Sequence, residues 1–128
     1  MKFQIKLFRW PDRGNHVIII ARGFINTDGL EQIFRNVAET TQSLVDCKVL
    51  IDLLDATYRF EAADINAFVS RLSSDSFPNN SKIALVSARE IEPYDQLHRL
   101  STCLSPLGLK IAAFYDSNMA VDWLAETI

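Results

Sequence analysis

The apolar positions of this chain concentrate in three runs, and each run begins with a lysine. The runs start at Lys48, Lys82 and Lys110 and extend to residues 54, 86 and 115. Such nearly continuous runs are typical of parallel strands that helices cover on both faces. The starts are 82 − 48 = 34 and 110 − 82 = 28 residues apart, which is the length of a strand and a crossover helix. The pattern therefore predicts an α/β domain.

The N-terminal part of the chain has a different pattern. Residues 2–9 alternate polar and apolar, residues 11–15 are rich in turn formers, and residues 17–21 are apolar, so we expect an antiparallel hairpin. Helical spacing follows in residues 27–44, 62–72, 93–104 and 117–124. We predict a single α/β domain over residues 1–128. Its mixed β-sheet would have an N-terminal antiparallel hairpin followed by parallel strands, helices on both faces, and the order ββαβαβαβα.

Composition and charge exclude several classes of protein. The chain is 48% apolar, and its net charge of −3 comes without a basic stripe, so we expect no nucleic-acid partner. The longest apolar stretch, 17–21, is far shorter than the roughly 20 residues that span a bilayer. The N-terminus is not typical of a signal peptide, which favours a cytoplasmic protein. Cys47 and Cys103 have no cysteine or histidine at ligand spacing, so we expect reduced thiols in the core.

Candidate chemistry is expected where strands lead into helices, because ligands of open α/β sheets gather there. The four glycines are scattered, which argues against a Rossmann or P-loop nucleotide site. Asp55 and Asp116 fit a receiver-type phosphoaspartate site only loosely, since Lys110 begins its strand instead of ending it. His16 and His98 have no partner in a catalytic motif. We therefore predict no catalytic residue, no metal, no cofactor and no enzymatic activity.

Aromatic residues gather around the second predicted helix. They are Tyr58, Phe60, Phe68 and Phe77, and the first two lie in the loop before the helix. Two interpretations stay open for them. They could pack in the core, or they could form a partly exposed apolar groove for a partner or a small hydrophobic ligand.

Two segments carry a resemblance to a known family. The segment 49–56, Val-Leu-Ile-Asp-Leu-Leu-Asp-Ala, precedes a helix, and the segment 112–116, Ala-Ala-Phe-Tyr-Asp, precedes the last one. With the order of elements, these segments resemble the STAS superfamily, and more narrowly its SpoIIAA-like branch of bacterial anti-sigma-factor antagonists. The resemblance implies a non-enzymatic regulatory module that binds a protein such as an anti-sigma kinase. In that family, phosphorylation of a serine or threonine at the helix start controls binding.

The chain departs from the family at that helix start. An Asp-Ser-Ser-Gly type of turn is replaced by Glu-Ala-Ala-Asp at residues 61–64, so the usual phosphoacceptor serine is missing and Thr57 is the nearest hydroxyl. The predicted surface for a partner or ligand comprises Asp55, Thr57, Tyr58, Phe60, Glu61, Asp64 and Phe68. The alternative function is a carrier or sensor of a small apolar, lipid-like ligand, as in the Sec14-type domains with which this branch is compared. The strand at 2–9 leaves an open edge at which a homodimer could form.

Overall fold

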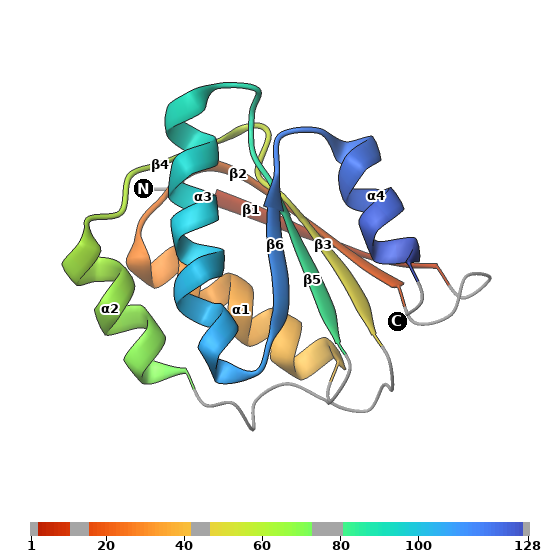
Figure 1. The fold of residues 1–128 in the computed structure, drawn as a ribbon, viewed down its shortest axis with the longest axis horizontal. Helices are drawn as coiled ribbons and strands as arrows, with labels where there is room; N and C mark the ends of the chain where they lie inside the picture. Colours follow the sequence, from red (N-terminus) through yellow and green to blue (C-terminus); the bar gives the residue numbers. More distant parts are fainter. Residues whose placement is uncertain (1–2, 11–15, 42–46, 73–80, 127–128) are drawn as a thin grey trace.

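The structure is a layered α/β arrangement in which helices lie on both sides of one sheet (Figure 1). The computed structural model describes residues 3–10, 16–41, 47–72 and 81–126. The strands are β1 (Phe3–Trp10), β2 (His16–Ile25), β3 (Lys48–Asp52), β4 (Ala56–Tyr58), β5 (Lys82–Val86) and β6 (Lys110–Phe114). The helices are α1 (Thr27–Thr41), α2 (Ala62–Arg71), α3 (Ile91–Leu104), the short η2 (Ser105–Leu107) and α4 (Ser117–Ala125).

The sheet has the strand order β1-β2-β3-β5-β6, and β4 pairs with β2 beyond the end of β3. The pairs β2–β3, β2–β4, β3–β5 and β5–β6 are all parallel. Only β1 runs antiparallel to its neighbour, with Phe3 opposite Gly23 and Trp10 opposite His16. Consequently β2 to β6 form a parallel body, and the carboxyl ends of its strands meet at one edge of the sheet.

Two features of the predicted fold class are wrong. The division into an antiparallel hairpin followed by parallel strands fails because β2 belongs to the parallel body and pairs in parallel with both β3 and β4. The turn expected at residues 11–15 lies outside the described residues. The order ββαβαβαβα also lacks one strand, β4, where the sequence indicated only a loop.

The turn between β3 and β4 contains one residue more than the facing stretch of β2, and this allows β4 to pair with β2. Ile20 pairs with Asp52 and Gly23 pairs with Ala56, so two residues of β2 (23 − 20 − 1) face three residues of the other chain segment (56 − 52 − 1). The Asp52 carboxylate accepts a hydrogen bond from the Leu54 N–H at 2.9 Å, which stabilises the turn. After this bulge-like turn the chain rejoins β2, still in parallel.

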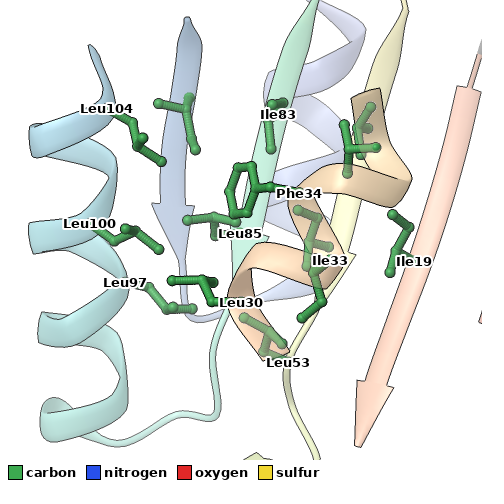
Figure 2. Packing of buried hydrophobic residues seen from close by; sticks show 14 of the residues in the cluster. Ile19, Leu30, Ile33, Phe34, Leu53, Ile83, Leu85, Leu97, Leu100 and Leu104 are labelled. Atoms are coloured by element: carbon green, nitrogen blue, oxygen red, sulfur yellow. The ribbon is translucent and has the colours of Figure 1, made fainter. Parts of the chain in front are cut away.

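The two faces of the sheet carry cores of very different size. The helices α1, α2 and α3 lie on one side and α4 lies alone on the other (Figure 1). On the larger side, α1 presents apolar residues at helical spacing, and the Phe34 ring is fully buried over β5 (Figure 2). The side chains of α3 that meet this core are Leu97, Leu100 and Leu104. On the smaller side, α4 contributes Ala120 and Leu124 to a cluster with three strand residues, Leu50, Ala84 and Val86.

Candidate functional site

The aromatic part of the predicted surface is buried. Tyr58 and Phe60 expose only 8% and 4% of their surfaces, and their rings stack with centroids 5.7 Å apart. Phe68 is fully buried and packs edge to face against Phe34 at 5.3 Å. For these three residues the proposed groove of exposed aromatic side chains is therefore wrong, and the packing interpretation is correct. Phe77 lies outside the described residues. The pairing of β4 with β2 is the cause, because it draws this segment onto the sheet.

Gln96 of α3 fixes the segment that carries these aromatic residues. Its side-chain oxygen accepts a hydrogen bond from the Phe60 N–H at 2.6 Å, and its amide nitrogen donates to the Tyr58 carbonyl at 3.4 Å. The Tyr58 hydroxyl donates to the Pro93 carbonyl at 3.3 Å, and burial raises the pKa of this phenol. Sequence reasoning missed Gln96, because a single glutamine on a helix gives no signal that its partner lies 36 residues away.

The polar members of the predicted surface divide into two groups. Asp55, Thr57 and Glu61 are exposed at the carboxyl edge of the sheet. Asp55 forms an exposed ion pair with Arg22 at 3.7 Å. Asp64 is half-buried and accepts a hydrogen bond from the Glu61 N–H at 3.1 Å, so it stabilises the start of α2. A role of the exposed three in partner binding stays a prediction.

Two hollows flank this segment where it faces the start of α3. One, of about 510 Å³, lies between the turn after β3 and the residues that lead into α3, and its lining includes Asp55, Thr57, Glu90 and Glu92. The other, of about 360 Å³, lies between the residues before α2 and α3 itself, and its lining includes Arg59, Glu92 and Asp95. Both hollows are rich in charged side chains, which suits a polar surface contact better than an acyl chain.

Large apolar side chains are exposed at the same edge. Among residues 16–41, 47–72 and 81–126, whose side-chain burial the structure describes, five such residues are exposed, and all five lie at or just beyond the carboxyl ends of β2, β3, β5 and β6: Phe24, Leu54, Ile91, Tyr115 and Met119. We call this set the carboxyl rim. Ile91, at the first position of α3, is 81% exposed. None of the five belongs to the surface predicted from the sequence, because in the sequence each resembles an ordinary core residue of its strand or helix.

Charged side chains surround the carboxyl rim. Glu90, Glu92 and Asp95 are exposed and have no ion-pair partner within the described residues. Asp116 caps α4 by accepting hydrogen bonds from the Asn118 and Met119 N–H groups at 2.8 and 3.3 Å. It also pairs with Arg89, and this hydrogen bond, with those from the backbone, lowers the pKa of the Asp116 carboxyl.

The other side chains considered for chemistry are those of His98, Cys47 and Cys103. His98 is exposed on α3, and the ring centroid of Tyr94 lies 5.9 Å from its own. Cys47 is buried and Cys103 is half-buried. In the part of the chain that the structure describes, no three histidine, cysteine, aspartate or glutamate side chains are grouped to hold a metal ion. Nor does any helix in those ranges have the length and apolar character needed to cross a membrane.

Comparison with known proteins identifies the fold. No family model matches the chain, and no curated protein is similar to it. It is similar to the solved structure of an uncharacterised DUF3478-family protein with a SpoIIAA-like fold from Shewanella loihica PV-4. The TM-score is 0.53 at 18% identity, over 96% of this chain and 93% of that one. The chain therefore has a SpoIIAA-like fold, which confirms the resemblance seen in the sequence at the level of the fold.

Proposed function

We propose that this protein is a non-enzymatic module that binds another protein at the carboxyl rim. The observation that carries the proposal is that the exposed large apolar side chains of residues 16–41, 47–72 and 81–126 gather at one edge of the sheet. Exposed apolar patches of this kind typically mark interaction sites. The exposed residues predicted from the sequence, Asp55, Thr57 and Glu61, lie at the same edge.

The polar groups of this edge support a binding role more than a catalytic one. Asp52, Asp64, Gln96 and Asp116 each use a side-chain oxygen to hold a backbone N–H group. A carboxylate that caps a helix in this way is already engaged in stabilising the fold. Turnover of a substrate that depended on Asp55, Glu90 or Glu92 would contradict the proposal.

The charges indicate the chemistry of the partner. Ile91 lines one hollow with Glu92 and Asp95 and also with Arg59 and Arg99. Glu90, Glu92 and Asp95 form no ion pair with the described side chains, so a complementary surface has an apolar contact with lysine or arginine opposite these acids. Complete burial of an isoleucine is worth about 1.5–3 kcal/mol, or at least about tenfold in affinity. Salt should weaken association, because the charges at the border of the contact are exposed.

The start of α2 suggests how such binding is regulated. It carries Glu61 and Asp64, where SpoIIAA-like switches have a phosphoacceptor hydroxyl. A fixed negative charge therefore lies where phosphorylation would add about −1.5 to −2 charges. We accordingly expect partner binding that does not depend on phosphorylation at this helix start.

Capture experiments with matched variants test the proposal. The wild type, the rim variant Ile91→Ser/Met119→Ser and the control Lys110→Ser, at the opposite edge, serve as baits in extracts of the source cells. We expect a protein that the wild type and the control retain, that the rim variant loses, and that crosslinks to residues near Ile91. A partner retained equally by all three baits, or crosslinked elsewhere, would contradict the proposal.

A further inference from the structure

Basic and titratable side chains form a row at the opposite, amino edge of the sheet. His16, Lys48, Lys82 and Lys110 are register partners on β2, β3, β5 and β6. Register partners on parallel strands project from the same face, and the contacts of Lys82 with α4 identify that face as the one that α4 covers. Like charges on neighbouring strands destabilise a sheet, so this row requires compensation.

Lys82 is compensated by the end of α4. Its ammonium donates hydrogen bonds to the Trp123 and Glu126 carbonyls at 3.0 Å each, and it lies 4.8 Å from the centroid of the Trp123 ring. Burial lowers the pKa of Lys82, the charges of Lys48 and Lys110 lower it further, and Glu126 partly offsets them. Lys82 therefore has a structural role, because it binds carbonyl groups at the end of α4, of which that of Trp123 also accepts the Glu126 N–H at 3.2 Å.

Lys48 is not compensated in this way. It is half-buried, and its side chain has neither a hydrogen bond nor an ion pair with the described side chains and backbone. The positive charges of Lys82 and Lys48 repel each other. A half-buried cation beside another cation is unfavourable unless an anion is present.

A cavity lies beside Lys48. Its volume is about 160 Å³, and residues of α4 form one of its walls. The lining is mainly apolar, with His16 and Lys48 as its basic members and Val17, Ile18, Leu50, Val121, Leu124 and Ala125 as the rest. An apolar cavity of roughly 150 Å³ is large enough to hold benzene.

We infer that this cavity binds a small organic anion with an apolar body of about five or six carbons. The carboxylate pairs with Lys48, and the apolar body lies against Leu50, Val121 and Leu124. The inference is independent of partner binding at the carboxyl rim, because the cavity lies at the other edge of the sheet.

The probes are chosen to separate charge from shape. Hexanoate and benzoate carry both an apolar body and a carboxylate, acetate carries the charge alone, and hexylamine carries the opposite charge. Each is titrated into the full-length protein at constant ionic strength while backbone amide chemical shifts are recorded. We expect saturable binding of hexanoate or benzoate, with the largest shifts at Leu50 and Ala125, and affinities for acetate and hexylamine at least about tenfold lower.

Matched variants then assign the binding to the cavity. Lys48→Met should weaken hexanoate binding by about tenfold or more, because a charge-assisted contact is lost. Lys110→Met, an exposed member of the same row outside the cavity lining, should change it by less than about twofold. Val121→Phe, which fills the cavity, should abolish binding while the spectrum remains that of a folded protein.

Several outcomes would overturn the inference. They are the absence of saturable binding of both hexanoate and benzoate, equal binding of acetate, or equal effects of Lys48→Met and Lys110→Met. Hexanoate binding that survives Val121→Phe would likewise place the ligand elsewhere.

Discussion

Replacement of Gln96 should clearly lower the free energy of unfolding, because this one side chain forms two buried hydrogen bonds. Its oxygen is the acceptor for the buried Phe60 N–H at 2.6 Å, and its nitrogen donates to the Tyr58 carbonyl. Gln96→Met keeps the length of the side chain and removes both hydrogen bonds. The Phe60 N–H would then be buried without a partner, which costs about 1–3 kcal/mol.

Urea unfolding measures this effect directly. For a loss of about 2 kcal/mol and a slope of about 2 kcal/mol per molar, the midpoint should fall by about 1 M. The slope itself should not change, because the variant exposes a similar surface on unfolding. Tyr58→Phe is the matched control, since it removes only the longer 3.3 Å bond to Pro93 and should cost less than about 1 kcal/mol.

The reasoning would be refuted if Gln96→Met unfolded within about 0.5 kcal/mol of the wild type. The reasoning would also be refuted if Tyr58→Phe were more destabilising than Gln96→Met.

The raised pKa of Tyr58 provides an independent test at alkaline pH. Its raised pKa favours the neutral phenol in the folded state, so the associated stability is complete below about pH 10 and declines above it. In Tyr58→Phe this part of the alkaline decline, followed by urea midpoints, should be absent.

Three further outcomes follow from burial and charge. Phe68→Ala should lower the free energy of unfolding by about 3–5 kcal/mol in thermal or urea melts, because its fully buried ring leaves a cavity; a change near zero would place Phe68 at the surface after all. Asp116 has a lowered pKa, so its stabilising contribution is present above about pH 4 and declines as the pH falls further. The urea midpoint should therefore fall less steeply from neutral to acidic pH for Asp116→Asn than for the wild type. Parallel curves of midpoint against pH would speak against the pairing with Arg89. Lys82→Met should cost about 1–2 kcal/mol in urea unfolding, whereas Lys110→Met should be neutral, and the reverse ranking would contradict the contact with α4.

The parallel body of the sheet could be predicted because its signal is local. The three lysine-led runs have strand length, near-continuous hydrophobicity and helical spacing between them, and each of these follows from burial under helices. The strand β4 gives no comparable signal. It has three residues, and its pairing depends on one extra residue in the turn after Asp52, which no periodicity reveals.

The site was only partly predictable, because only some of its features follow from local signals in the sequence. Asp55, Thr57 and Glu61 were placed correctly at the carboxyl edge, because the ends of parallel strands meet there regardless of detail. Whether an aromatic residue of the adjoining segment is exposed depends on tertiary contacts. Tyr58 and Phe60 are buried because β4 pairs with β2 and because a glutamine on another helix holds their backbone.

The lysine that begins three strands shows how position decides the role of a repeated pattern. In the sequence the three residues are equivalent, and they mark where buried strands start. In the sheet they share one row, yet among the described residues only the ammonium of Lys82 donates hydrogen bonds to carbonyl groups at the end of α4. Lys110 belongs to the strand at the edge of the sheet and is exposed to water, which screens its charge. Lys48 has neither solution, because it is half-buried beside an apolar cavity, and this difference is why it is the member of the row expected to bind an anion.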